Sequence, residues 1–258
     1  TFNASTYAAT LTTDAIALGG NVSGSGALTI QPKTAATTIA IGSAATGDLK
    51  LDDTELGYLV DGFSSITIGS TSGTGAIAVA YTTPYTFTDP LTIQGKSTSG
   101  GGAITASSAL NTGTNSLTIS TYGAVSVAAI TSGTLAITGN GITLNGDVTT
   151  SGTQTYTGAV TLGGSVTAAS TGASSTGNTI SFGSSVNGAQ AFVVDAGVGA
   201  ISFASTVGNS TSLSSISLTT SHLTGITLAG NITTTGTQTY TGAVRLASNA
   251  TLTTTNRN

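Results

Sequence analysis

The sequence predicts an all-β fold, a right-handed parallel β-helix (β-solenoid) of roughly twelve coils with about 21 residues in each coil. Three observations lead to this prediction. Short segments with apolar residues at every second position recur along the chain, Gly, Asn, Ser and Asp separate them, and one long stretch occurs twice. Alternation with period 2 is typical of half-buried strands, and the separating residues favour turns.

The alternating segments carry Ile, Leu, Val or Ala at positions i and i+2, with Thr, Ser or Ala between them. They lie at 27–30, 38–41, 65–69, 76–79, 91–95, 116–120, 124–127, 135–139, 141–146, 159–164, 179–184, 200–205, 215–220, 225–230 and 243–248. Helical periodicity is nearly absent. We therefore expect strands almost everywhere.

The internal repeat predicts how the strands stack. Residues 142–162 match residues 226–246 at 16 of 21 positions, and both copies contain GTQTYTGAV. Four coils of about 21 residues would span the distance from one copy to the next and return the second copy to the same register. A β-sandwich has no reason to repeat at this spacing. We expect one solenoid over 1–258, with a first copy at 142–225 and a truncated second copy at 226–258.

One section, 48–96, departs from the pattern and is expected to bear an insertion. Its residues LKLDDTELGYLVDGF (49–63) concentrate acidic side chains. They predict a short helix near 52–60, capped by Asp53 and with Glu55 in its first turn. We expect this helix to leave the coil and cover its flank.

The composition excludes several classes of protein. Charged residues make up 5% of the chain, the net charge is −4 and the five Lys and Arg residues are scattered, so we expect no nucleic-acid partner. A mean hydropathy of +0.30 argues against disorder. There is no Cys, and therefore no disulfide or thiolate metal site. No run approaches the ~18 apolar residues of a membrane helix, and residues 1–25 do not read as an uncleaved signal peptide.

Two stretches are similar to segments of known proteins. Residues 53–95 and GTQTYTGAVTL at 152–162 resemble segments of very large bacterial surface proteins of the filamentous-haemagglutinin type. The resemblance implies a right-handed parallel β-helical shaft that is extracellular or on the bacterial cell surface. Solenoid ends expose unpaired strand edges unless they are capped, and the sequence indicates no capping helix at either terminus, so we expect the chain to stack end to end with copies of itself or with adjoining solenoid segments.

Candidate catalytic residues are few. His222, the only histidine, could be combined with Asp195 and a serine into a hydrolase triad, but the chain has no G-x-S-x-G turn. A polar histidine in a turn is the favoured interpretation. The carboxylates that a polysaccharide lyase or hydrolase would cluster are isolated in the sequence, at Asp14, Asp89, Asp147 and Asp195. We therefore expect no enzymatic activity and no cofactor.

The acidic residues near the predicted helix form a weak candidate patch. Carboxylates at Asp52, Asp53, Glu55 and Asp61, with Asp48 before them, supply the oxygens that Ca²⁺ prefers. Their spacing fits neither the EF-hand nor the glycine-rich nonapeptide pattern. A capped, solvated helix is the favoured interpretation, and no metal is expected.

The repeat places Gln154 and Tyr156 in the first copy where Gln238 and Tyr240 stand in the second. The two tyrosines could be platforms on which sugars stack. The alternative is that they are corner residues that cover the edge of the coil, aided by the glutamines. Repetition favours this structural role, because a packing solution recurs wherever the coil does.

The sequence thus predicts a non-enzymatic extracellular structural protein, a rigid shaft or a filament subunit. The alternative is an adhesin, with host or surface glycans as partners, or an ice-binding module, either of which would recognise its ligand through one lateral face. A T-x-T array of threonines would mark such a face. Because the outward positions mix Thr, Ser, Ala and Arg245, we expect the threonine registry to be poor. No membrane insertion is expected.

Overall fold

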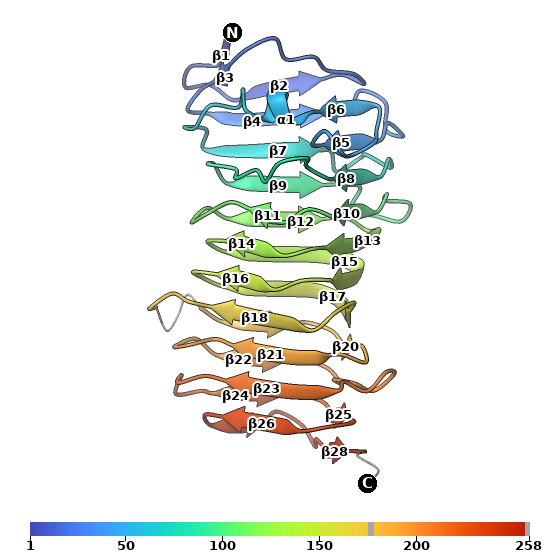
Figure 1. The fold of residues 1–258 in the computed structure, drawn as a ribbon, viewed down its shortest axis with the longest axis vertical. Coiled ribbons are helices and arrows are strands. Elements are labelled where there is room, and N and C mark those ends of the chain that lie inside the picture. Colours follow the sequence, from blue (N-terminus) through green and yellow to red (C-terminus); the bar gives the residue numbers. More distant parts are fainter. Residues whose placement is uncertain (175–177, 256–258) are drawn as a thin grey trace. The chain divides into compact units, whose positions relative to one another are not determined.

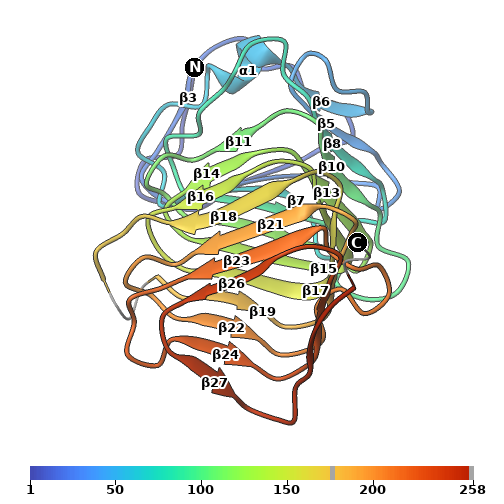
Figure 2. The ribbon, with the colours of Figure 1, turned by 60° about the horizontal axis from the view of Figure 1, so that its bottom comes forward.

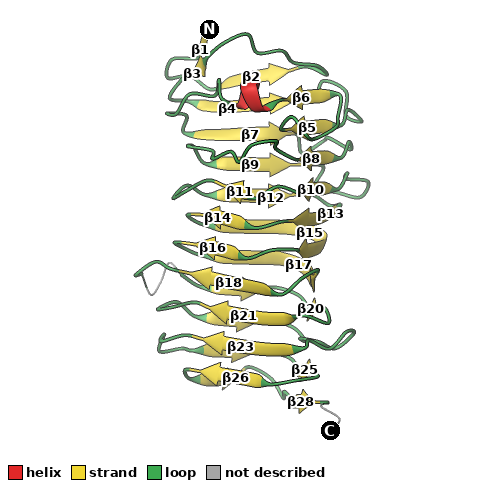
Figure 3. Ribbon diagram, viewed as in Figure 1, coloured by secondary structure: helices red, strands yellow, loops and turns green. Residues whose placement is uncertain are grey.

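The computed structural model describes residues 1–174 and 178–255. It divides into two compact units, each described here by itself. Unit 1 comprises Thr1–Val127 and Thr138–Asn140, and unit 2 comprises Ala128–Ile137 and Gly141–Asn258. In both, strands joined by loops make up nearly all of the regular secondary structure, and one short helix lies in the described part of the chain (Figure 3). The prediction of an all-β protein is confirmed.

Unit 1 contains the helix α1 (Asp53–Leu56) and thirteen strands. These are β1 (Phe2–Asn3), β2 (Ala9–Thr12), β3 (Val22–Ser23), β4 (Ala27–Gln31), β5 (Ile39–Ile41), β6 (Leu49–Leu51), β7 (Ser65–Gly69), β8 (Ile77–Val79), β9 (Leu91–Gln94), β10 (Ile104–Ala106), β11 (Leu110–Asn111), β12 (Leu117–Ser120) and β13 (Ala124–Val127).

The strands of unit 1 pair in parallel and form rows, a row being a set of strands lying side by side. One row runs β2, β4, β7, β9, β12 (Figure 1). A second runs β6, β5, β8, β10, β13. A shorter third set joins β1 to β3 and Val22 of β3 to Leu59. The chain passes from one row to the next and returns, and one such passage is called a circuit below.

The core of unit 1 follows from this register. Leu28, Ile66, Leu91 and Leu117 face each other across consecutive strands of the first row, and each is at most 1% exposed. Parallel strands lie about 4.8 Å apart, so each inward side chain contacts the equivalent one on the neighbouring strand. The alternation seen in the sequence places Thr at the outward positions of the same strands.

An excursion interrupts the circuits between β5 and β7. Because β5 pairs with both β6 and β8, β6 lies on the side of β5 away from β8. Helix α1 follows β6, and the register partners Leu28 and Ile66 are therefore separated by much more chain than an ordinary circuit. The helical turn expected near 52–60 is confirmed, but its predicted cap is wrong. The N-cap is Asp52, which forms a capping box with Glu55, and Asp53 is the first helical residue.

Unit 2 contains the remaining strands, and β15 (Leu135–Leu144) contributes to both units. The others are β14 (Ile130–Ser132), β16 (Val148–Thr150), β17 (Gln154–Leu162), β18 (Val166–Ser170), β19 (Ile180–Phe182), β20 (Val186–Asn187), β21 (Ala191–Asp195), β22 (Ile201–Phe203), β23 (Ser215–Thr219), β24 (Ile226–Leu228), β25 (Ile232–Thr234), β26 (Gln238–Thr241), β27 (Val244–Leu246) and β28 (Leu252–Thr254).

Three parallel rows build unit 2. The first contains the start of β17, then β19, β22, β24 and β27. The second runs from the end of β17 through β20, Val207 and β25 to β28. The third contains β14, β16, β18, β21, β23 and β26, which lie side by side in Figure 2. The chain visits the three rows in this order.

Circuit length varies more than the sequence suggests. Apart from the excursion, the circuits range from a short one, between the register partners Ile226 and Val244, to a long one between Ile77 and Ile104. As a result, the two copies of the repeat do not return to the same row. Strand β16 lies in the third row, whereas its counterpart β25 lies in the second. Between these two strands the chain changes row eleven times. Each circuit visits three rows, so four circuits would need twelve changes, and the predicted four-coil register is wrong.

Candidate functional site

The repeat positions form a buried hydrogen-bonded cluster in unit 2. The Gln154 side chain is fully buried, and its Nε2 donates to the carbonyl oxygens of Ala169 (2.7 Å) and Val148 (3.4 Å) and to Thr150 Oγ1 (3.2 Å). Its Oε1 accepts a hydrogen bond from the Tyr156 hydroxyl at 2.9 Å. The cluster therefore satisfies both ends of an amide that would otherwise be costly to bury.

The second copy makes the same bonds. Gln238 Nε2 donates to the carbonyl of Thr253 (2.8 Å), the carbonyl of Ile232 (3.4 Å) and Thr234 Oγ1 (3.2 Å). The Tyr240 hydroxyl donates to Gln238 Oε1 at 2.8 Å. These partners stand at the same sequence offsets as in the first copy. Identical residues thus build the identical corner in two different rows.

The environments of the two tyrosines differ. Tyr156 is completely buried and stacks on Phe182, with ring centroids 4.8 Å apart and an interplanar angle of 1°. Burial raises the pKa of its hydroxyl. Tyr240 is half-buried, and burial raises its pKa to about 12. The prediction that these tyrosines cover the outer edge of the coil is wrong for Tyr156, which lies in the core, where a sugar cannot reach it.

Another position of the repeat explains why Asp and Asn exchange there. Asp147 Oδ1 accepts from the N–H of Thr167 at 2.8 Å, and Asn231 Oδ1 accepts from the N–H of Thr251 at 2.9 Å. Both acceptors bond the backbone of the following circuit, at the same distance along the chain. An oxygen is required at this corner, and a charge is not.

The acidic residues of the predicted patch are placed in three different settings. Asp52 Oδ1 accepts from the N–H of Glu55 (2.9 Å), and Glu55 returns the bond to the N–H of Asp52 (3.0 Å). Glu55 also accepts from the N–H of Leu18 at 2.6 Å. Asp61 lies exposed after the helix, next to Asp89. In residues 1–174 and 178–255 no three His, Cys, Asp or Glu side chains gather to hold a metal ion.

Asp53 ties the helix to two loops. Its carboxylate accepts from the N–H of Ser43 (2.7 Å), from the N–H of Thr82 (2.9 Å) and from the Thr82 hydroxyl. The hydroxyl bond from Thr82 is the largest cause that lowers the pKa of Asp53, to about 2, and the Ser43 and Thr82 N–H groups add to it.

Acid is therefore expected to weaken this tie. The carboxyl pKa is near 3.9 in an unfolded chain and about 2 in the fold, so its stabilisation is complete above pH ~4 and is lost as the pH falls toward 2. The thermal unfolding midpoint of the Asp53→Asn variant should then depend less on pH between 4.5 and 2 than that of the unmodified chain. Parallel melting curves of both proteins across this range measure the difference. Equal slopes would contradict the role given to Asp53.

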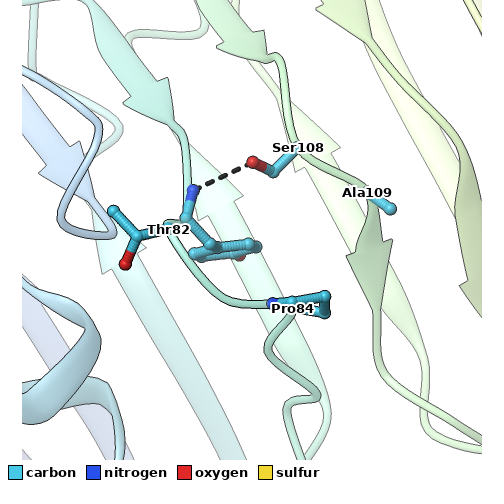
Figure 4. A pocket seen from close by; sticks show the side chains of 5 residues that line it. Thr82, Pro84, Ser108 and Ala109 are labelled. Carbon is cyan, nitrogen blue, oxygen red and sulfur yellow. Dashed lines mark hydrogen bonds between the residues drawn. The ribbon is translucent and has the colours of Figure 1, made fainter.

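A pocket of about 290 Å³ opens in unit 1 beside this tie and is lined by Tyr81, Thr82, Pro84, Ser108 and Ala109. The Tyr81 N–H donates to Ser108 Oγ at 2.9 Å, and the Thr82 side chain points away from Ser108 (Figure 4). Two of the polar side chains are thus already engaged, Thr82 by Asp53 and Ser108 by the backbone. The volume is at the lower limit for a small-molecule site.

Of the remaining candidates, His222 and Asp195 serve local turns, and Asp14 bonds the neighbouring circuit. His222 Nδ1 accepts from the N–H of Thr224 at 3.1 Å, and Asp195 Oδ1 accepts from the N–H of Gly197 at 2.9 Å. Asp14 accepts from the N–H of Thr34 at 2.7 Å and from its hydroxyl, and the hydroxyl bond is the main reason why its pKa falls to about 2. Each of these polar groups is thus engaged in hydrogen bonds within the fold.

The outward face of the first row in unit 1 is more regular than the sequence suggested. Five threonines stand in register on consecutive strands and form the threonine rank, Thr10, Thr29, Thr67, Thr92 and Thr118. The five strands that carry it contain no charged residue. The neighbouring outward positions on the same strands are Thr12, Gln31, Gly69, Gln94 and Ser120, so one column of threonines is in register but the pairs of a T-x-T array are not, as expected. In unit 2 even a single column is mixed, because the corresponding outward positions are Thr155, Ser181, Ser202, Thr227 and Arg245.

Comparison of the chain with protein-family models, with curated proteins and with solved structures gave no match. In the part of the chain that the structure describes, no helix has the length and apolar character to span a membrane.

Proposed function

We propose that this chain is a structural protein, a β-solenoid in the form of a right-handed parallel β-helix of roughly twelve circuits. Its role is mechanical: a rigid, nearly uncharged shaft or filament subunit on a bacterial surface, of the filamentous-haemagglutinin type and without enzymatic activity. The observation that carries this proposal is the repeat, which forms the same hydrogen-bonded corner in two different rows. A residue set that recurs at any corner is a building module, as expected where function resides in the repeated architecture.

The proposed partners are copies of the chain or adjoining solenoid segments stacked end to end. The last described strands of unit 2 support this, because their aliphatic side chains are exposed. Val244 is 44% exposed, Leu246 55% and Leu252 46%, although Val244 and Leu246 stand in register with buried Ile226 and Leu228. Parallel strands with open edges pair readily with further strands.

Electron microscopy of the purified protein tests the proposal. Continuous fibres with an axial repeat near ~4.8 Å would make the chain a filament subunit. Isolated rods with the same repeat would make it a segment of a shaft. Compact particles in which no such spacing is found would contradict both.

The threonine rank favours a second candidate function, recognition of a ligand through one lateral face, as an adhesin of glycans or as an ice binder. Regular hydroxyls on an uncharged sheet face suit a flat, regular partner surface. Thermal hysteresis and pull-down on insoluble polysaccharides would measure this binding. Thr67→Lys should abolish it, and Thr227→Lys, on an outward position of unit 2, should not. No binding by the unmodified chain would leave the structural function alone.

A further inference from the structure

Asp89 is an unusual carboxylate for a nearly uncharged protein. It stands before β9 in unit 1 and is only 3% exposed. Its Oδ1 accepts from the N–H of Gly62 at 3.0 Å. Its Oδ2 is buried and has no hydrogen-bond partner among the described residues. A buried carboxylate oxygen without a partner is costly, and such an atom calls for an explanation.

A second carboxyl group lies beside it. Asp61 precedes β7 as Asp89 precedes β9, and these two strands pair in parallel, so the two turns are neighbours. The N–H of Gly62, the residue after Asp61, bonds Asp89 Oδ1. Burial raises the pKa of Asp89, and the charge of Asp61 adds to this effect. No pattern in the sequence indicates this proximity, because the two residues are far apart in the chain. The expectation that Asp89 is isolated is therefore wrong.

We propose that Asp61 and Asp89 bind a divalent cation, with Ca²⁺ as the ion that fits best. A cation between the two carboxylates removes their repulsion and gives the orphaned Oδ2 its partner. Ca²⁺ accepts irregular oxygen sets that combine carboxylates, backbone carbonyls and water, and turns supply such sets, whereas Mg²⁺ demands near-ideal octahedral geometry. With two carboxylates, the site belongs to the weak class, with a Kd of about 10⁻⁴–10⁻³ M.

Terbium luminescence provides a direct test. Tb³⁺ replaces Ca²⁺ and emits when a nearby aromatic ring transfers energy to it. The chain has no Trp, so Tyr is the only efficient donor. Tyr85 lies near Asp89, because burial raises the pKa of the Tyr85 hydroxyl and the charge of Asp89 adds to this effect. Titration of the full chain with Tb³⁺ should give saturable emission that excess Ca²⁺ abolishes. Tyr85→Phe should reduce the emission several-fold and leave unchanged the Ca²⁺ concentration that halves it.

Substitutions locate the ion. Asp61→Asn, at an exposed position, should weaken Tb³⁺ binding at least tenfold, and Asp89→Asn should do the same. Asp195→Asn, in a turn of unit 2, is the matched control and should bind like the unmodified chain. Circular dichroism of each variant confirms that it is folded. Absence of saturable emission, or emission that survives in folded Asp61→Asn, would overturn the proposal and leave a shared proton as the partner of Oδ2.

Discussion

Replacing Phe182 with alanine is expected to lower the free energy of unfolding by about 3–5 kcal/mol, the cost of removing a buried phenyl ring. Phe182 is 1% exposed and stacks between Tyr156 and Phe203, with centroid distances of 4.8 Å on both sides. It also meets Phe192 edge to face at 5.5 Å. Three aromatic contacts end with one substitution, and the rigid rows on either side cannot collapse into the space. Urea unfolding followed by circular dichroism measures the loss.

The matched control is Ser181→Ala on the same strand. Ser181 faces outward between Thr155 and Ser202, and its substitution should change the free energy of unfolding by less than about 0.5 kcal/mol. A loss below about 1 kcal/mol for Phe182→Ala would contradict the stack. It would mean that the aromatic rings are not packed as the register requires.

Much of the fold was predictable from local patterns. Alternation of Ile, Leu and Val with Thr and Ser identified the strands, because a strand with one buried face must repeat with period 2. The same rule places Tyr156 correctly, since Gln154, Tyr156, Val160 and Leu162 share one parity and all face inward. From the sequence, Tyr156 is expected at the edge of the coil because Gln154 shares its face, and a glutamine is unfavourable in a core. Only the structure shows the hydrogen-bond partners that allow Gln154 to be buried.

The helix cap is also readable from local spacing. Asp52 and Glu55 stand as a capping box requires, whereas Asp53 lacks a suitable residue three positions later. What the sequence could not supply is the register between circuits. Turns absorb insertions at little cost, so the short circuit at Ile226–Val244 and the long one at Ile77–Ile104 both keep their strands paired. These circuit lengths determine the row in which the second copy of the repeat lies, and they bring Asp61 close to Asp89. Neither feature could therefore be predicted from the sequence.

The repeat itself allows a paired measurement of burial. Gln154→Leu is expected to lower the free energy of unfolding by about 2–4 kcal/mol, because the Tyr156 hydroxyl and the carbonyl of Ala169 lose their partner inside the core. Gln238→Leu removes the same bonds in the second copy. There Gln238 and Tyr240 are half-buried, so water can replace the lost partner, and the expected cost is below about 1 kcal/mol.

The two variants differ only in setting, so the ratio of their effects measures what burial adds to a hydrogen bond. The Tyr156→Phe change provides the internal check. In the Gln154→Leu background it removes an unpaired hydroxyl and should recover part of the lost stability, whereas alone it should be destabilising, a coupling that a double-mutant cycle resolves. An equal loss of free energy of unfolding for the two Gln→Leu variants would mean that the local turn alone stabilises the repeat, without a contribution from burial. A larger loss of free energy of unfolding for Gln154→Leu would mean that the repeat is more stable in the first copy because another circuit stacks on it. This is what a structural building unit requires.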